Sequence, residues 1–309
     1  MIKLLLNRPY LPEGRNESYR KNAEALLTVS DAKKYCREET PLEMTVERCD
    51  AKHDLYGAIG PFPAVIRRSE AISAAVSGAE KEIAVLSLVG KTVCCTIRDV
   101  CSNAEGQPLL ELSRRGMQDK ALSYLLDTVQ EGDVIPASVS SMSPIGVFAD
   151  VGCGVIALLP IRQISVSRIQ HPAERFAPHQ PIRAAVRKID RAAGRLLLTH
   201  KELLGTWAEN AAQFQTGETI TGVVRGIKSY GVFIELTPNL TGLAETDDTL
   251  QEGERVSVLI KALLPDKHKI KLHVIGRLPA CPAATPLQYK ITEGNISGWS
   301  YYESVNAAP

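Results

Sequence analysis

Two phenylalanines inside a repeated phrase are the residues of this chain whose type and spacing best suit a chemical task. The phrase Gly146-Val147-Phe148-Ala149-Asp150 returns 85 residues later as Gly231-Val232-Phe233-Ile234-Glu235. Successive side chains of a strand point to opposite faces, so both rings and both acids are expected on the polar side. The aliphatic residues expected in a core are Val147, Ala149, Val151, Val232, Ile234 and Leu236. Rings on the outside of a small β-domain can stack on flat ligands such as nucleic-acid bases.

Cationic residues near the first phrase would complete such a surface by contacting phosphate groups. Residues 162–201 contain nine Lys and Arg against two acids, Glu174 and Asp190, which is a local charge of +7. In that segment Arg183 and Arg187 alternate with aliphatic residues, so both are expected to point outward. Phosphate contacts supply most of the affinity in non-specific nucleic-acid binding. Two plainer interpretations are a solvated charged face and rings that merely close one end of a barrel.

The predicted binding set combines aromatic and cationic residues from both copies. Tyr230 precedes the second glycine and adds a third ring, whereas Ile145 holds that place in the first copy. The full set is Phe148, Tyr230, Phe233, Arg183, Arg187, Arg195, Lys228, Lys261, Lys269 and Lys271. The first copy is richer in cations and the second is richer in rings. We therefore expect the two copies to cooperate on one strand of nucleic acid, since linked modules gain avidity.

Five short strands in each copy must position these residues. In the first copy the expected strands are 134–140, one beginning at Gly146, 154–159, 182–189 and 195–199. In the second copy they are 219–227, one beginning at Gly231, 241–244, 256–263 and 269–274. The first copy carries 11 extra residues near 164–174, confined to one loop, where insertions are tolerated. Five strands in about 70 residues favour an OB-type Greek-key barrel.

Three features of the repeat resemble the RNA-binding S1 domain of the ribosomal protein S1 family. They are the Gly-acid openings at 132–133 and 217–218, the Gly-Val-Phe phrases, and the ending Arg195–Glu202. The stretch Gly106–Arg115 resembles another such ending and implies an earlier, eroded copy before residue 115. The resemblance implies binding of single-stranded RNA. Members often carry a histidine on the third strand, where this chain has Pro160 and Glu245.

The eroded copy has Leu55-Tyr56-Gly57-Ala58 where the Gly-Val-Phe phrase should stand. We expect it to keep the barrel and to have lost much of the RNA face. The predicted fold class is mainly β, with tandem five-stranded OB-fold (S1-type) barrels joined by short helices. The predicted segments are an N-terminal helical preface at 1–40, a degenerate barrel at 41–115, a helical linker at 116–130, a barrel at 131–202, a helical linker at 203–214, a barrel at 215–275 and a C-terminal extension at 276–309. Trp207 is expected to pack the second linker helix against a barrel.

Composition predicts a cytoplasmic protein with no membrane segment. No apolar run approaches the roughly 18 residues that a membrane helix needs, and the apolar N-terminal stretch is too short for a signal peptide. The seven cysteines are irregularly spaced without a C-x-x-C pattern, as expected of reduced thiols. The six histidines show no metal-ligand spacing, and no phosphate-loop or nucleophile motif is present. We therefore predict no enzyme activity and no cofactor.

The leading functional prediction is non-catalytic binding of single-stranded RNA, with messenger RNA as the expected ligand, in translation or RNA metabolism. The small ribosomal subunit is the expected further partner, and the oligomeric state is left open. The alternative is a protein-interaction scaffold that docks on the ribosome or an RNA-processing complex and binds little RNA itself. The net charge of only +1 and the eroded copy favour this alternative. A processing enzyme is disfavoured, because no segment is left for a catalytic domain.

Overall fold

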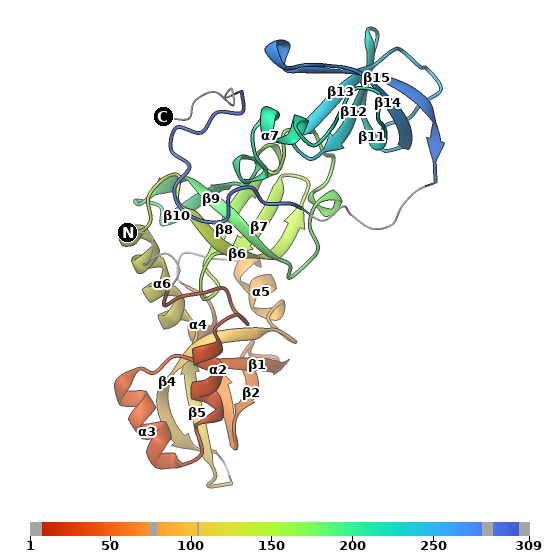
Figure 1. The fold of residues 1–309 in the computed structure, drawn as a ribbon. Helices are drawn as coiled ribbons and strands as arrows, with labels where there is room; N and C mark the ends of the chain where they lie inside the picture. The colour runs from red at the N-terminus through yellow and green to blue at the C-terminus, as the bar shows by residue number, and fades with distance from the viewer. Residues whose placement is uncertain (1–7, 74–78, 104, 280–286, 303–309) are drawn as a thin grey trace.

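A computed structural model describes residues 8–73, 79–103, 105–279 and 287–302 of the chain (Figure 1). Three closed barrels of five strands each follow one another along the sequence. This confirms the predicted mainly β fold of tandem five-stranded barrels. None of the helices among these residues combines the length and apolar character that a membrane span requires.

The first barrel has the strand order β1-β2-β3-β5-β4. Its strands are β1 (Leu42–Cys49), β2 (Leu55–Ile59), β3 (Phe62–Ile66), β4 (Thr92–Ser102) and β5 (Pro108–Ser113). Its helices are α2 (Glu17–Glu24), α3 (Val29–Glu38), α4 (Arg68–Ala71) and α5 (Ala79–Leu86). The helix α3 begins at a capping box in which Thr28 and Asp31 satisfy each other's backbone N–H groups. The predicted helical preface is thus present as α2 and α3, which lie against the barrel (Figure 1).

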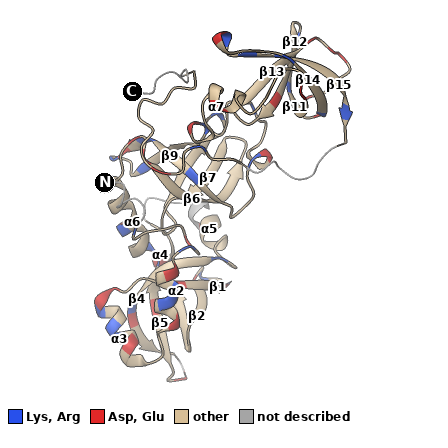
Figure 2. Cartoon of the chain, in the orientation of Figure 1, with Lys and Arg blue, Asp and Glu red and all other residues tan. Residues whose placement is uncertain are grey.

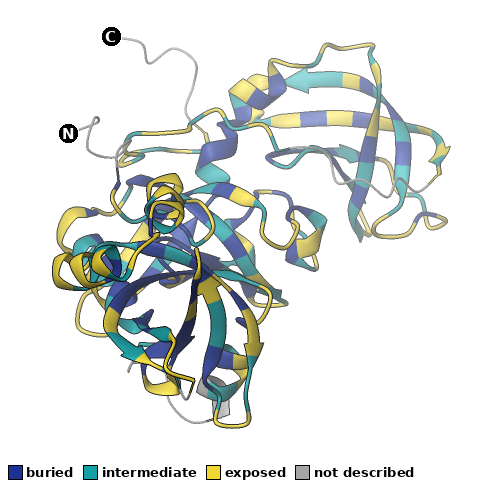
Figure 3. Ribbon diagram, turned by 90° about the horizontal axis from the view of Figure 1, so that it is seen from below, coloured by how far each residue is buried: buried dark blue, intermediate teal, exposed yellow. Residues whose placement is uncertain are grey.

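The middle barrel follows α6 (Arg115–Thr128) and contains the first Gly-Val-Phe phrase. Its strands are β6 (Val134–Ser143), β7 (Gly146–Asp150), β8 (Ile156–Pro160), β9 (Pro181–Asp190) and β10 (Arg195–Thr199). The expected core residues Val147, Ala149 and Val151 are fully buried, which confirms the predicted alternation. Figure 3 shows buried and exposed residues alternating along the barrel strands. The extra loop after β8 folds as two short 3-10 turns, η1 (Ile161–Gln163) and η2 (Pro172–Glu174).

The last barrel contains the second phrase. Its strands are β11 (Thr219–Lys228), β12 (Gly231–Thr237), β13 (Leu240–Ala244), β14 (Arg255–Leu264) and β15 (Lys269–Leu278). A turn η4 (Pro265–Lys267) connects β14 to β15. Val232 and Ile234 are fully buried as predicted, whereas Leu236 is half-buried at the edge of the same core.

The linker predicted as one helix over 203–214 is two short pieces, η3 (Lys201–Leu204) and α7 (Trp207–Ala211). Gly205 separates them because its φ of +86° lies in a region that suits glycine, and Thr206 then caps α7 through Glu209. Trp207 is 4% exposed and lies in the core of the last barrel, as expected. Six cysteines in the described part of the chain are unpaired, while Cys281 lies outside it.

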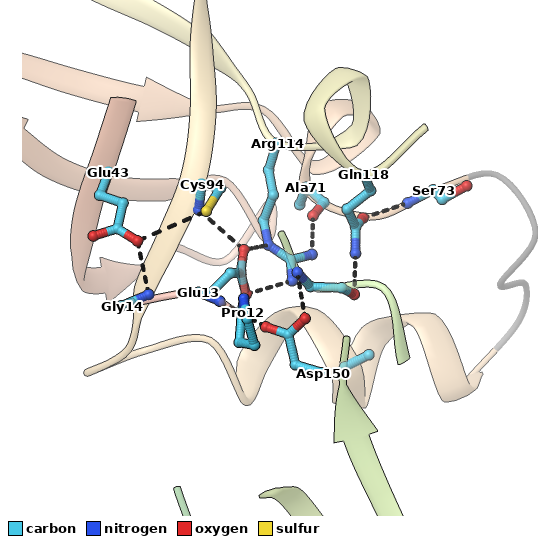
Figure 4. A network of polar contacts seen from close by, with 12 residues as sticks. Pro12, Glu13, Gly14, Glu43, Ala71, Ser73, Cys94, Arg114, Gln118 and Asp150 are labelled. Carbon is cyan, nitrogen blue, oxygen red and sulfur yellow. Dashed lines mark hydrogen bonds and ion pairs between the residues drawn. The ribbon is translucent and has the colours of Figure 1, made fainter. Parts of the chain in front are cut away.

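A polar network joins the first two barrels and corrects one prediction (Figure 4). Asp150, expected on the polar face, is only 6% exposed. Its Oδ2 accepts from the Glu13 backbone N at 2.7 Å, and its Oδ1 accepts from Gly152 N at 2.8 Å and Gly154 N at 3.0 Å. Glu13 in turn pairs with Arg114, at 2.7 and 2.8 Å. Burial, with the nearby Glu13 charge second, raises the pKa of Asp150 to about 7.

A second buried network joins the middle and last barrels and corrects the same prediction for Glu235. Glu235 Oε2 accepts from Arg175 Nη2 at 2.6 Å and from Arg225 Nε at 2.7 Å. Arg225 also pairs with Glu174 of η2. Glu235 is 7% exposed. The alternation rule placed this acid outside the barrel correctly, but it could not show that another domain would cover it.

The extra loop of the middle barrel makes this junction. Ser167 N donates to Pro238 O at 2.9 Å, and Val166 N donates to Asn239 Oδ1 at 3.1 Å. Pro238 and Asn239 form the turn between β12 and β13. The insertion that sequence comparison found is therefore a docking element for the next barrel.

The C-terminal segment 287–302 returns across the middle barrel, where Figure 1 shows it as a dark blue trace without helices or strands. Asn295 forms an isolated β-bridge with Asp133. Tyr289 packs with Val134, Ala185 and Leu203. The segment thus covers part of β6 and β9.

Candidate nucleic-acid interface

Strand register places the two phenylalanines at the same position of their barrels. In each barrel we define the central row as five residues, one from each strand, that are paired with one another across the sheet at this position. The row of the middle barrel is Ser141, Phe148, Leu158, Leu197 and Lys188. The row of the last barrel is Gly226, Phe233, Leu243, Lys271 and Ala262. Each aromatic therefore has an aliphatic neighbour and a lysine in its own row.

The first barrel has an aromatic residue at the same position, which the sequence comparison missed. Its central row is Arg48, Tyr56, Val65, Glu111 and Asp99. Irregular pairing occurs at the same place in all three barrels, between Val46 and Arg48 in the first. The available signal was the alignment of Leu55-Tyr56-Gly57 with Val147-Phe148-Ala149, which preserves the aromatic although the glycine before it is lost.

The ring of Tyr56 is already occupied by its own barrel. The Arg48 guanidinium carbon lies 3.8 Å from the ring centroid, as in a cation–π contact. The Tyr56 hydroxyl donates to Asp50 Oδ2 at 3.0 Å. Burial, and secondarily this hydrogen bond, raises the pKa of Tyr56. Two acids complete the row, of which Glu111 pairs with Arg67 at 2.7 Å.

The last barrel presents the most open aromatic pair. Tyr230 is 66% exposed, and its ring meets the Phe233 ring edge-on with centroids 6.0 Å apart and an interplanar angle of 89°. Phe233 itself is half-buried. Edge-to-face packing holds both rings in place while leaving faces accessible to a ligand.

The glycine of each phrase is required by close strand approach. Gly146 has φ +152° and Gly231 has φ +150°. A Cβ at Gly146 would lie 2.2 Å from Leu159 O, and one at Gly231 would lie 2.5 Å from Ala244 O. These contacts with backbone atoms cannot be relieved by a side-chain movement, which explains why the phrase repeats with glycine.

The middle barrel offers a half-buried ring surrounded by aliphatic side chains and cations. Phe148 is half-buried, and the nearby Ile145 and Ile156 are 60% and 46% exposed. Arg187 is the extra residue of a β-bulge, because Val186 pairs with Leu198 and Lys188 pairs with Leu197. Arg187, Lys188 and Arg195 are exposed. The bulge brings Lys188, which was not in the predicted set, into the row of Phe148.

Arg183 lies apart from that row. It pairs with Pro136 on β6, five residues before Ser141. Its backbone N donates to the Tyr289 hydroxyl at 3.2 Å, and its side chain is half-buried. The prediction placed Arg183 and Arg187 on one open face, but the C-terminal segment covers the Arg183 side.

The predicted lysines of the last barrel divide into two kinds. Lys228, Lys269 and Lys271 are exposed and have no salt-bridge partner among the described residues. Lys261 pairs with Glu245 at 2.9 Å, and the hydrogen bond and charge of Lys261 lower the pKa of Glu245. Figure 2 shows acidic and basic residues intermixed on α3 of the first barrel.

Other titratable groups are used structurally. Both ring nitrogens of His200 are engaged, Nδ1 with Ile164 O at 2.8 Å and Nε2 with the Tyr289 hydroxyl at 3.1 Å. Complete burial lowers the pKa of His200 to about 4. Within the described ranges no three His, Cys, Asp or Glu side chains gather as metal ligands would.

Closed five-stranded barrels with an aromatic residue on the second strand define this chain as a protein of the OB-fold class. Residues 128–201 match the family model described as the S1 RNA binding domain. The middle barrel, which these residues form, is therefore an S1 domain.

Curated relatives extend this similarity over about half of the chain. It is 29% identical over 184 residues to small ribosomal subunit protein bS1 of Staphylococcus aureus (strain COL), covering 54% of this chain and 47% of that protein. It is 31% identical over 179 residues to the protein of the same name from Rickettsia conorii, covering 54% and 31%. The matched region thus spans less than half of each relative's length.

Among solved structures, a multidomain protein with nucleic acid binding domains from Streptococcus pneumoniae is 10% identical, with a TM-score of 0.25. The match covers 76% of this chain and 73% of that one.

Proposed function

We propose that this protein binds single-stranded RNA on the central rows of its middle and last barrels and catalyses no reaction. The observation that carries the proposal is the Tyr230–Phe233 pair, with Lys271 in the same row as Phe233. Stacking of a base on an aromatic side chain contributes about 1–3 kcal/mol and tolerates any base. Lys271, with the exposed Lys228 and Lys269, supplies charge for the phosphates.

The middle barrel contributes mainly charge to the same RNA strand. Phe148 offers one partly covered ring, while Lys188, Arg187 and Arg195 are exposed cations around it. The buried Arg175–Glu235 pair holds this barrel against the last one. A strand bound by one barrel is therefore held at high effective concentration near the other. Arg183 is outside the proposed contact set.

The names of the curated relatives support a role in translation. We place the protein in the cytoplasm, with messenger RNA as its ligand and the small ribosomal subunit as a partner. The match of residues 128–201 to an RNA-binding family supports the choice of RNA over other flat ligands.

A protein-interaction scaffold is the second candidate, and the first barrel favours it. Its Tyr56 ring is covered by Arg48, and Glu111 and Asp99 stand in its row. With its ring covered and with acids where the other barrels have a lysine, this surface suits bases and phosphate groups less well than a protein partner. In the leading proposal the first barrel binds no RNA and serves as a support.

The test is binding of the full chain to a labelled oligouridine over a salt series. Phosphate contacts predict that log affinity falls linearly with log salt, with a slope of about −0.7 per contact for a single strand. Phe233→Ala and Tyr230→Ala should each cost about 1–3 kcal/mol of binding free energy. Tyr56→Ala is the matched control, because it removes a ring from the same register position and should leave affinity unchanged.

Two results would count against RNA binding. One is the absence of binding at low salt, which would favour the scaffold. The other is equal affinity for the wild type, Phe233→Ala and Tyr230→Ala, with circular dichroism showing that all variants are folded.

A further inference from the structure

The C-terminal segment ends in an aromatic cluster on the last barrel that the proposed RNA site does not yet include. Trp299, Tyr301 and Tyr302 approach one another and reach His268 in the connection between β14 and β15. The Tyr302 and His268 rings have centroids 4.8 Å apart at 59°. His268 in turn meets the core residue Trp207 edge-on at 5.3 Å.

Two adjacent tyrosines in this cluster have different environments. Tyr301 is anchored, since its hydroxyl donates to Asn239 O and its carbonyl accepts from Trp207 N at 2.9 Å. Its ring packs against the core of the last barrel, and burial raises its pKa. Tyr302 is 61% exposed. Tyr301 thus holds the segment in place, and the ring of Tyr302 is presented to solvent on top of His268.

This exposed ring lies against His268, at the end of a row of outward lysines on β15 that begins in the central row. Ile270 and Leu272 are 2% exposed, so Lys269 and Lys271 point outward on the same side of β15. Lys271 belongs to the row of Phe233, and His268 directly precedes Lys269. Lys271 lies two strands away from Phe233, with Leu243 between them, and His268 lies three residues before Lys271. These strand and residue spacings give roughly 14 Å between the Phe233 and His268 positions.

We propose that Tyr302, supported by His268, is a second base-stacking position for the RNA that binds on Tyr230 and Phe233. The inference rests on the proposed function and adds the path that the RNA takes over the last barrel. The strand would run from the Tyr230–Phe233 pair along Lys271 and Lys269 to Tyr302. An OB-fold binds about 4–16 nucleotides, so one barrel can hold a strand that covers both aromatic positions.

The experiment compares full-length wild type, Tyr302→Ala, Tyr302→Phe and Phe233→Ala on oligouridines of about 5 and about 15 nucleotides. Tyr302→Ala should raise the Kd of the longer oligomer about fivefold or more, which is the lower end of one stacking contact. Tyr302→Phe keeps the ring and should bind within about twofold of wild type. Phe233→Ala should weaken both oligomers.

The outcomes separate this inference from the function on which it rests. If Phe233→Ala weakens binding while Tyr302→Ala binds the longer oligomer as tightly as wild type, the inference is wrong and the proposed function stands. If Tyr302→Phe loses as much affinity as Tyr302→Ala, stacking on the ring is not the cause and the inference is also wrong. If neither oligomer binds the wild type, both proposals fail.

A photocrosslink gives an independent readout. A longer oligomer with 4-thiouridine at one end should crosslink to the peptide containing Tyr302. When the label is moved to the other end, the crosslink should move to the peptide containing Tyr230. Crosslinks at Tyr230 from either end, with none near Tyr302, would overturn the proposed path of the RNA.

Discussion

Arg175 and Glu235 form an ion pair across the junction of two barrels, with their side chains only 6% and 8% exposed. Arg225 shares the same carboxylate oxygen at 2.7 Å. Arg175 Nε is buried without a hydrogen-bond partner among the described residues. Buried charges at this junction stabilise the fold only together, because a charge left without its partner keeps the cost of desolvation and loses the compensating attraction.

Removal of the shared carboxylate should therefore destabilise the junction strongly. We expect Glu235→Leu to lower the free energy of unfolding by about 3–5 kcal/mol, since two arginines lose their buried partner. Adding Arg175→Met and Arg225→Met should restore much of the loss. Urea denaturation measures the effect. Glu245→Ala, which breaks an exposed pair in the same barrel, is the control and should cause no measurable loss. A small effect of Glu235→Leu would mean that water reaches the junction and solvates the two arginines.

Two substitutions should convert the central row of the first barrel into an RNA-binding surface. Arg48→Ala uncovers the Tyr56 ring, and Glu111→Lys places a lysine where the last barrel has Lys271. We expect the double variant to bind oligouridine more tightly than wild type does. Glu38→Gln, on α3, makes the same net charge change of +1 away from the row and should give a smaller gain. Equal gains in the two variants would show that net charge alone is responsible.

Asp150 should make the first junction sensitive to pH. Its pKa is raised in the folded protein to about 7, so folding favours the protonated carboxyl. The contribution is fully present below the ordinary Asp value near 4 and is lost as the pH rises through about 7. Thermal unfolding of wild type and Asp150→Asn between pH 5 and 8 tests this. The wild type should lose stability relative to the variant as pH rises, and parallel curves would contradict the assignment.

His200 should act in the opposite direction. Its folded pKa is lowered to about 4, so the neutral ring is favoured, and the stability it contributes above pH 6.5 is lost as the pH falls toward 4. Because the ring bonds Tyr289, we expect the segment 287–302 to become protease-sensitive on acidification. Limited proteolysis from pH 7 to about 4.5 would show it. His200→Gln should shift this transition, and an unshifted transition would assign it to another group.

The sequence predicted the barrels well, because a period of two and a repeated phrase both report on local strand geometry. It placed Phe148 and Phe233 correctly outside their cores for the same reason. It missed Lys188 because a bulge at Arg187 changes which side chain stands beside Leu197. It also left Asp150 and Glu235 in solvent, since alternation within a strand carries no information about a neighbouring domain.

The C-terminal segment was beyond prediction for a different reason. Its structure depends on contacts such as Tyr289 with His200 and Tyr301 with Asn239, which lie 89 and 62 residues apart in sequence. No helical or strand periodicity marks such a segment. Tyr302 could be noticed as an aromatic residue, but its place against His268 required the path of the chain.

The loop near 164–174 belongs to one barrel but serves the next, because Ser167 and Glu174 bind partners that only the last barrel provides. Recombination that exchanged the last barrel alone would leave these groups without their partners. Duplication of the middle barrel without its neighbour would have the same effect. The middle and last barrels therefore depend on each other as a pair, and neither presents a complete surface without its neighbour.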